Sequence, residues 1–202
     1  MKWKVCGMRE PNNVSDVAAL KPDYMGFILW EGSKRYCPTP TTLPDGVAKV
    51  GVFVNASIEE IIEAISQHKL DVVQLHGDET PKFCRELLGK AEIIKAFSVG
   101  DSFDFDALID YVPYCDFFLF DTKGAMPGGN GTCFDWEILN NYSFDTPFFI
   151  SGGIGLAEVP SITELCKSDL PVFAIDINSK FEHTPANKDV ESLAVFKEKL
   201  AL

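Results

Sequence analysis

Two side chains stand where a base and an acid could work together. Cys6 ends a short apolar run, and Asp121 directly follows the apolar residues 117–120. A thiol acts as a base or nucleophile when its pKa is lowered, and a partly desolvated carboxyl group favours its protonated form, which suits a general acid. Each has a simpler alternative, because a lone cysteine is usually a small buried residue and a lone carboxylate can accept hydrogen bonds from loop amides.

Two further segments could hold a phosphate group. Residues 151–155 (SGGIG) and 176–179 (DINS) each follow or end an apolar run. Free backbone amides at a helix N-terminus bind anions, and glycine lets the backbone approach them closely. The predicted phosphate-binding residues are Gly152, Gly153, Asn178 and Ser179. Simple turns are the alternative interpretation.

Arg35 and His76 are the other polar candidates. Arg35 lies in the SKRY segment at 33–36, where its guanidinium could bind a carboxylate through two parallel hydrogen bonds, although a surface salt bridge is the simpler role for one arginine. His76 could exchange a proton near neutral pH or serve as a neutral hydrogen-bonding group. Because His68 and His183 do not cluster with His76 in the sequence, we predict no metal site.

Short apolar runs at nearly even spacing must position these residues. They lie at 3–6, 24–29, 49–54, 72–75, 93–97, 117–120, 148–150 and 172–175, with starts 21 to 31 residues apart. Such runs indicate strands buried on both faces, as in a parallel sheet. Eight units predict an α/β fold, a single compact (β/α)8 TIM barrel over residues 1–202, with a doubly wound open sheet as the competing architecture. In a barrel the chemistry lies just after the strands, where all these candidates fall.

Helix signals separate the runs. Ser57 with Glu60 forms a capping box, Thr80 precedes a proline at the first helical position, and Asn187 is the predicted cap of a C-terminal helix. The weaker helical patterns cover 14–20, 103–110, 134–139 and 156–165. A glycine-rich stretch after the sixth run has the length and composition of a mobile flap, with a passive loop as the alternative. The flap residues are Gly128, Gly129, Asn130 and Gly131.

Composition limits the classes of partner. Hydrophobic residues make up 46% and charged residues 24%, as in soluble globular proteins, and the net charge of −12 argues against nucleic acid and anionic membranes. No apolar run approaches the roughly 20 residues of a membrane span, and no signal-peptide pattern precedes the first run. The six cysteines include no Cys-x-x-Cys pair. We therefore expect a cytoplasmic protein with reduced thiols and neither a nucleic-acid nor a membrane partner.

Nine short segments carry a resemblance that spans nearly the whole chain. They are KVCGM (4–8), SKRY (33–36), GVFVN (51–55), VQLHG (73–77), FDT (120–122), GGNG (128–131), FDW (134–136), SGG (151–153) and DINS (176–179). Each segment is weak alone, but the ordered set is specific. Together they resemble the phosphoribosylanthranilate isomerase family, compact (β/α)8 enzymes of tryptophan biosynthesis.

The resemblance implies an Amadori rearrangement of N-(5′-phosphoribosyl)anthranilate, a small phosphorylated substrate, to 1-(2-carboxyphenylamino)-1-deoxyribulose 5-phosphate. Asp121 would be the general acid that opens the ribose ring, and Cys6 the general base that removes the C2′ proton, for which its thiol pKa should be lowered. Arg35 would bind the anthranilate carboxylate. The other expected substrate contacts are Gln74, His76 and Asp176. The resemblance implies no cofactor and no metal, and it leaves monomer and homodimer open.

The chain departs from the family pattern in three loops. Residues 178–180 (NSK) replace the common Ser-Ser-Gly, Lys34 replaces a usual proline, and residues 132–133 (TC) replace a basic residue and threonine. Two alternatives therefore stay open. One is another phosphosugar barrel, either an indole-glycerol-phosphate synthase or a metal-dependent epimerase. The synthase needs a catalytic Lys–Glu pair, and the candidate lysines Lys49 and Lys95 have no Glu partner at a strand end. The other is a phosphate-binding barrel without catalysis.

Overall fold

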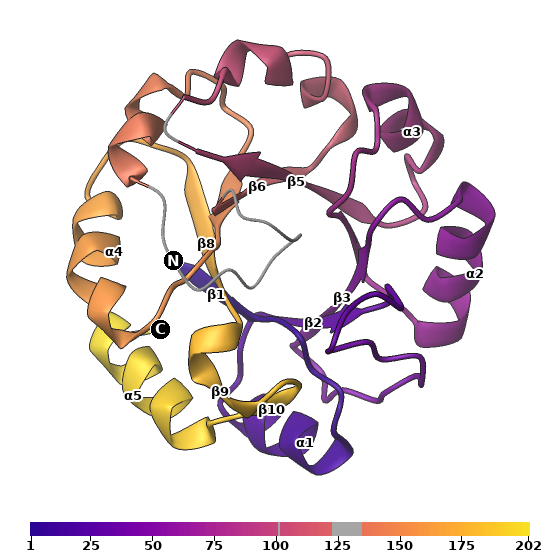
Figure 1. Ribbon diagram of the computed structural model, residues 1–202, viewed down its shortest axis with the longest axis vertical. Helices are drawn as coiled ribbons and strands as arrows, with labels where there is room; N and C mark the ends of the chain where they lie inside the picture. Colours follow the sequence, from indigo (N-terminus) through magenta and orange to yellow (C-terminus); the bar gives the residue numbers. More distant parts are fainter. Residues whose placement is uncertain (101, 123–134) are drawn as a thin grey trace.

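The strands of the chain close into a barrel. The computed structural model describes residues 1–100, 102–122 and 135–202. Within these ranges, eight parallel strands pair in chain order, and β1 pairs with β8 to close the ring (Figure 1). The strands are β1 (Lys2–Val5), β2 (Tyr24–Ile28), β3 (Ala48–Phe53), β4 (Val72–Leu75), β5 (Glu92–Val99), β6 (Phe117–Thr122), β7 (Phe148–Ile150) and β8 (Val172–Ile177). The barrel prediction is confirmed, and the open sheet is wrong.

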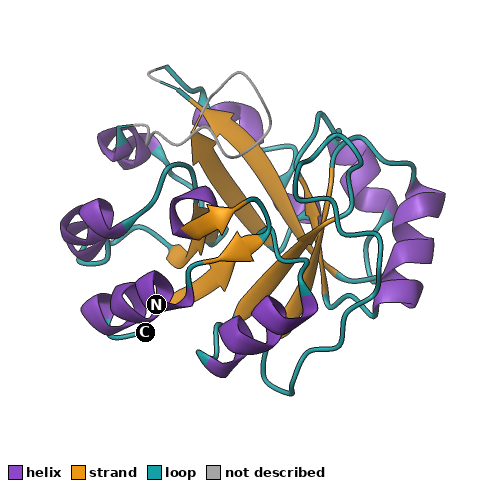
Figure 2. Ribbon diagram, turned by 60° about the horizontal axis from the view of Figure 1, so that its bottom comes forward, coloured by secondary structure: helices purple, strands orange, loops and turns teal. Residues whose placement is uncertain are grey.

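Helices surround the strands (Figure 2). The α-helices are α1 (Pro11–Ala19), α2 (Ile58–His68), α3 (Pro81–Glu86), α4 (Val159–Leu165) and α5 (Val190–Leu200). Short 3₁₀ helices are η1 (Phe105–Leu108), η2 (Val112–Tyr114), η3 (Trp136–Asn141), η4 (Leu156–Glu158) and η5 (Ser179–Phe181). Residues 29–47, all of them described, connect β2 to β3 without a helix, as the three prolines in that segment favour. The units are therefore trimmed, which lets 202 residues complete a barrel.

The helix caps follow two of the three predictions. The Ser57 hydroxyl accepts the Glu60 amide while the Glu60 carboxylate accepts the Ser57 amide, which confirms the capping box. Thr80 caps α3 as predicted. Asn187 does not cap the last helix: Asp189 does, accepting the Ser192 amide. Asn187 lies instead in β10 (Asn187–Lys188), which pairs antiparallel with β9 (Glu182–Thr184) in a hairpin that the sequence analysis missed.

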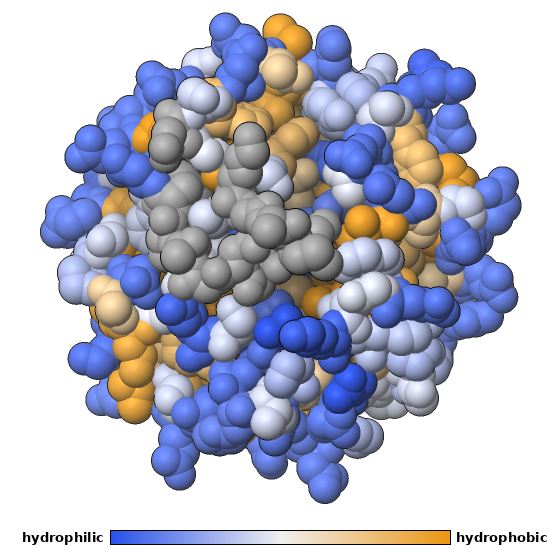
Figure 3. All heavy atoms as spheres, in the orientation of Figure 1, coloured by the Kyte–Doolittle hydropathy of each residue, from blue (hydrophilic) through white to orange (hydrophobic). Residues whose placement is uncertain are grey.

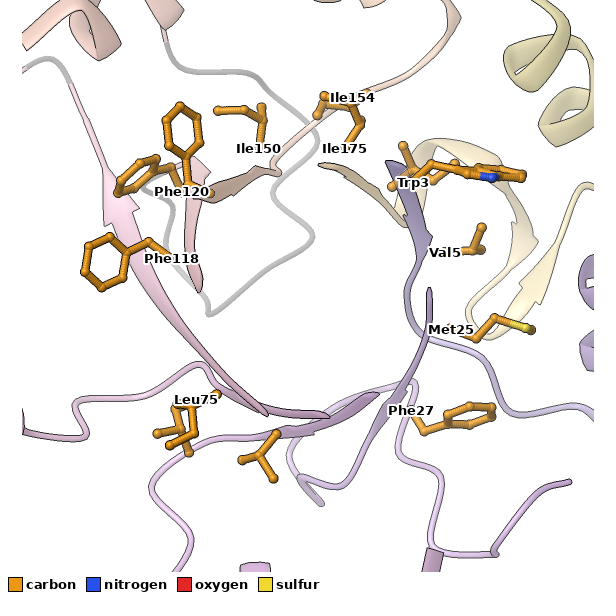
Figure 4. Close-up of a cluster of buried hydrophobic side chains, with 14 of the residues drawn as sticks. Trp3, Val5, Met25, Phe27, Leu75, Phe118, Phe120, Ile150, Ile154 and Ile175 are labelled. Carbon is orange, nitrogen blue, oxygen red and sulfur yellow. The ribbon is translucent and has the colours of Figure 1, made fainter. Parts of the chain in front are cut away.

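Alternate residues of each strand face opposite sides of the barrel wall. Phe118 and Phe120 on β6, like Trp3 and Val5 on β1, leave the ring on its outer side and pack beneath the helices (Figure 4). A second buried cluster fills the inside of the barrel. It includes Tyr24, Val50, Val52, Val72, Ile94, Leu119 and Phe149. The polar side chains near the carboxyl ends of β1, β4, β6 and β8 therefore stand on top of an apolar core.

Polar residues cover much of the face drawn in Figure 3. Hydrophilic residues dominate the rim of the face in Figure 3, and the hydrophobic residues visible there form separate small areas. None of the helices in the described residues combines the length and the apolar character that a membrane span requires.

Candidate active site

A pocket of about 640 Å³, counting its open mouth, lies at the carboxyl ends of the strands. Its lining includes predicted residues from both ends of the sequence: Cys6, Gln74, His76, Asp121, Gly152, Gly153, Asp176, Asn178 and Ser179. The structure thus brings together the predicted acid, the predicted base and both predicted phosphate segments. The predicted flap residues Gly128, Gly129, Asn130 and Gly131 lie outside the described residues.

Cys6 follows the last residue of β1 and is tied to β8, because its amide donates to the Ile177 carbonyl at 2.9 Å. Its side chain is buried. The neighbouring strand leaves room for the sulfur only because position 26 is glycine: a Cβ on Gly26 would lie 2.7 Å from Sγ. Burial raises the pKa of the Cys6 thiol, and the ammonium groups of Lys4 and Lys188 lower it by a smaller amount. The expectation of a lowered thiol pKa is therefore wrong.

Lys4 is a site residue that the sequence analysis missed. It is completely buried inside the barrel, and its Nζ donates to Asp176 Oδ2 at 2.9 Å. Since Lys4 and Cys6 are two residues apart, both face inward from the first strand segment. The alternation of inward and outward residues along the first strand could have identified Lys4 from the sequence. The second oxygen of Asp176, Oδ1, is buried without a hydrogen-bond partner among the described residues.

Asp121 lies within β6, which extends one residue beyond it, so Asp121 is a strand residue and not, as predicted, the first residue after the strand. It is 3% exposed. Its Oδ1 accepts the Thr122 amide at 3.0 Å, and its Oδ2 lies 3.2 Å from His76 Nε2. On the other side of the ring, Gln74 Nε2 contacts His76 Nδ1 at 2.8 Å. The Gln74 Oε1 atom is buried and has no partner among the described residues. These contacts hold the carboxyl group in one orientation.

The two predicted phosphate segments face one cavity. Gly152 has a φ of +94°, and a Cβ there would collide with the backbone and side chain of Thr122, so only glycine fits. After the neighbouring strand β8, Asn178 Oδ1 accepts a 2.6 Å hydrogen bond from Lys188 Nζ, which is supplied by the β9–β10 hairpin. The departure from Ser-Ser-Gly at residues 178–180 thus has a counterpart: the longer Asn178 side chain is held by a buried lysine.

Arg35 makes the predicted two-bond contact, but with a carboxylate of its own chain. Its Nε and Nη2 donate to Glu182 at 2.9 and 2.6 Å, and Glu182 also accepts from Lys188 at 2.7 Å. The pair is largely buried, so it is not the surface salt bridge of the simpler interpretation. Arg35 is not among the described residues that line the pocket. Its binding of a substrate carboxylate stays a prediction.

Lys95, the lysine considered for another phosphosugar chemistry, has an acidic partner after all. Its Nζ contacts Glu79 Oε2 at 3.1 Å and also donates to the carbonyls of Leu75, Gly77 and Ala96. Neither Lys95 nor Lys49 is among the described residues that line the pocket. Within the described ranges, no group of three His, Cys, Asp or Glu side chains could hold a metal ion, as a metal-dependent epimerase would require.

Known proteins share both the sequence and the fold. Residues 3–199 match the family model described as N-(5′-phosphoribosyl)anthranilate (PRA) isomerase. The N-(5′-phosphoribosyl)anthranilate isomerase of Parabacteroides distasonis is 45% identical, over 96% of this chain and 90% of that protein. The crystal structure of phosphoribosyl anthranilate isomerase from Thermus thermophilus superposes with a TM-score of 0.87 at 25% identity, covering 100% and 98% of the two chains.

A second solved structure bears on the ligand. It is a phosphoribosyl anthranilate isomerase in complex with reduced 1-(o-carboxyphenylamino)-1-deoxyribulose 5-phosphate, with a TM-score of 0.81 and 27% identity over 100% of this chain and 98% of that one. The match of the family model over nearly the full length, together with a relative at 45% identity, decides the family. The chain belongs to the N-(5′-phosphoribosyl)anthranilate isomerase family and is an isomerase of tryptophan biosynthesis.

Proposed function

We propose that the chain converts N-(5′-phosphoribosyl)anthranilate to 1-(2-carboxyphenylamino)-1-deoxyribulose 5-phosphate, with Asp121 as the general acid and Cys6 as the general base. The observation that carries the proposal is that both side chains line one pocket, which the two phosphate-type segments also line. The relative that binds the reduced product supports a ligand of this shape in the same fold.

The reaction moves protons and leaves the atoms of the substrate unchanged in number. Asp121 gives a proton to the ribose ring oxygen, the C1′–O bond breaks, and a Schiff base forms at C1′. Cys6, as the thiolate, removes the C2′ proton, and the electron pair forms the C1′=C2′ bond of an enolamine. The enolamine then gains a proton at C1′ and loses the one on its 2′-hydroxyl, which gives the ketone. General acid–base steps of this kind contribute about 10²–10⁴-fold each.

The contacts of Asp121 suit an acid that must point at one atom. The Thr122 amide holds one oxygen, and His76 holds the other. Gln74 Nε2 donates to Nδ1 of the imidazole, so the proton of the neutral ring sits on Nε2, facing the carboxylate. His76 therefore stabilises the carboxylate that remains after Asp121 has given up its proton.

Two buried oxygens support the proposed binding of the sugar hydroxyls at this end of the pocket. Gln74 Oε1 and Asp176 Oδ1 both belong to residues that line the pocket, and neither has a partner among the described residues. A buried polar atom without a partner costs about 1–3 kcal/mol. Ribose hydroxyl groups can donate to both oxygens, and binding would relieve that cost. These atoms give Gln74 and Asp176 their proposed role as substrate contacts.

The remaining walls match the two ends of the substrate. Ile28, Trp30, Val52 and Val54 form an apolar side that suits the aromatic ring. The phosphate would lie on the backbone of Gly152, Gly153, Asn178 and Ser179. Arg35 would bind the anthranilate carboxylate by giving up part of its contact with the Glu182 carboxylate. Both contacts join a guanidinium group to a carboxylate in the same geometry.

Substitution of the two proposed catalytic residues tests the function. Turnover is followed by the loss of substrate fluorescence for Cys6→Ser and Asp121→Asn, with Cys84→Ser as a control at a buried cysteine outside the pocket. Each site variant should lose at least about 10² in kcat, and the control should keep its activity. Wild-type turnover in both site variants would overturn the assignment. Failure of the wild type to complement a tryptophan auxotroph that lacks the isomerase, despite binding of the product analogue, would favour a binding protein without catalysis.

A further inference from the structure

Buried charged residues surround Cys6 beneath the pocket. Lys4 and Lys188 are 0% and 1% exposed, and Asp176 is 4% exposed. Lys4 Nζ contacts Asp176 at 2.9 Å, and Lys188 Nζ contacts Glu182 at 2.7 Å. Charges as deeply buried as these are costly unless they are paired.

The cations on the Cys6 side of the pocket outnumber the carboxylates by one. Arg35, which also interacts with Cys6, shares the carboxylate of Glu182 with Lys188, while Lys4 has Asp176 to itself. Three cations thus face two carboxylates on this side of the pocket. On the other side of Asp176, Asp121 contacts the neutral His76 ring and adds no charge in the protonated form that the proposed function gives it. An anion at Cys6 would balance the group, so these charges offset part of the burial that disfavours a thiolate there.

Lys4 has no direct route to the substrate in the described pocket. It is fully buried and is not among the described residues that line the cavity, whereas Cys6 and Asp176, on either side of it, both are. The charge of the Lys4 ammonium lowers the pKa of the Cys6 thiol, and the charge of Asp176 opposes that effect. Whatever Lys4 does for the reaction, it does through these neighbours.

We propose that Lys4 is a positioning residue that stabilises the thiolate form of Cys6, and that Asp176 holds the ammonium group of Lys4 in place and partly offsets its charge. The catalytic consequence rests on the proposed function, in which the thiolate removes the C2′ proton. The electrostatic part concerns the free protein and does not depend on the substrate.

The two partners should move the ionisation of Cys6 in opposite directions. The test follows the ¹³Cβ chemical shift of Cys6 against pH in the free protein. Lys4→Met should raise the midpoint by about one pH unit or more, because the thiolate loses the cation that acts on it most strongly. Asp176→Asn should lower it, because the ammonium then acts on the thiolate alone. Lys95→Met removes an equally buried, ion-paired lysine outside the pocket and should leave the midpoint unchanged.

Each outcome decides something. An unchanged midpoint in Lys4→Met, or a shift in the same direction for Lys4→Met and Asp176→Asn, overturns the proposal. If Lys4→Met does not fold by circular dichroism, Lys4→Gln and the sign of the Asp176→Asn shift decide instead. The low-pH limb of kcat/KM should move with the midpoint in Lys4→Met. If Cys6→Ser keeps full activity while the midpoints shift as expected, the proposed function fails and the electrostatic role of Lys4 stands.

Discussion

His76 Nε2 lies 3.2 Å from Asp121 Oδ2, across the mouth of the barrel from Cys6. The ring belongs to the segment after β4 and the carboxylate to β6, so the contact bridges β5. With Gln74 on its other nitrogen, the imidazole is the middle member of a chain of three side chains. The chain aligns the proposed acid without touching the proposed base.

Removing the imidazole should therefore impair the acid step. We expect His76→Leu to lower kcat about 10–100-fold, because Asp121 loses one of the contacts that fix its orientation. Gln74→Leu should lower it less through this route, because it acts on Asp121 by way of the ring. Steady-state kinetics of both single variants and the double variant measure the coupling. If the losses in log kcat of the two single variants add up to the loss in the double variant, the three residues do not act as a chain.

Gly26 should be indispensable to the geometry of the thiol. In Gly26→Ala the new methyl group would lie 2.7 Å from Cys6 Sγ, so the sulfur must move. We expect kcat/KM to fall at least about 10-fold, since misplacement of a reacting group by about 1 Å costs that or more. Gly51→Ala is the matched control: its methyl group meets Leu70 and Phe53, away from Cys6, and should lower stability more than turnover per folded molecule. Equal turnover in the two variants would argue against this view.

The pair of Arg35 and Glu182 should be worth more than an ordinary ion pair. Arg35→Met leaves the buried Glu182 carboxylate with Lys188 as its remaining basic partner, and we expect a loss of about 2–4 kcal/mol in the free energy of unfolding. Arg9→Met breaks an exposed pair with Glu10 and should cost less than about 1 kcal/mol. Urea denaturation of the two variants gives the comparison, and equal losses would contradict the burial argument.

Lys188 should make stability depend on alkaline pH. Burial lowers its pKa to about 8 from an ordinary value of 10.5, with Glu182 acting in the opposite direction. Below pH 8 the residue is protonated in both states, and the folded chain bears the full cost of the buried charge. Between about pH 8 and 10.5 the unfolded chain binds more protons at this site, so the free energy of unfolding rises with pH.

The comparison that isolates this residue is Lys188→Met. Relative to that variant, the wild type should gain on the order of 1–3 kcal/mol in the free energy of unfolding between pH 7 and 10, because the other titrating groups are common to both. Urea denaturation at intervals of pH measures the difference. Parallel stability curves for the two proteins would show that Lys188 titrates as an ordinary lysine.

Local patterns in the sequence carry most of the architecture. The apolar runs located the strands, since a strand buried on both faces needs continuous hydrophobic residues, as at 117–120. The Ser57 cap was readable because its partner lies three residues away. The prediction of Asn187 as a cap was wrong because the sequence shows only which residue types can cap a helix, and Asp189 is as suitable a type as Asn187. The β9–β10 hairpin is too short and too polar to give a strand pattern.

What the sequence could not provide was pairing over long separations. Arg35 was expected to bind a ligand carboxylate, but Glu182, 147 residues away, holds it. Lys4 and Asp176 are 172 residues apart, so only the closed barrel makes them partners. The raised pKa of Cys6 depends on how completely the pocket floor is buried, which no local pattern measures.

The pairing of β1 with β8 has a consequence for the newly made chain. Cys6 is synthesised well before its partners: its amide donates to the Ile177 carbonyl, and Lys4 is held by Asp176, which lies 172 residues further along the chain. At about 5–20 residues per second, roughly ten to thirty seconds pass before those partners exist. During that time the first strand has an unpaired edge, and no truncated product that lacks the eighth strand can assemble the proposed catalytic pair in its final surroundings. The site is thus completed only after the eighth strand has been made, although its thiol precedes the second strand in the chain.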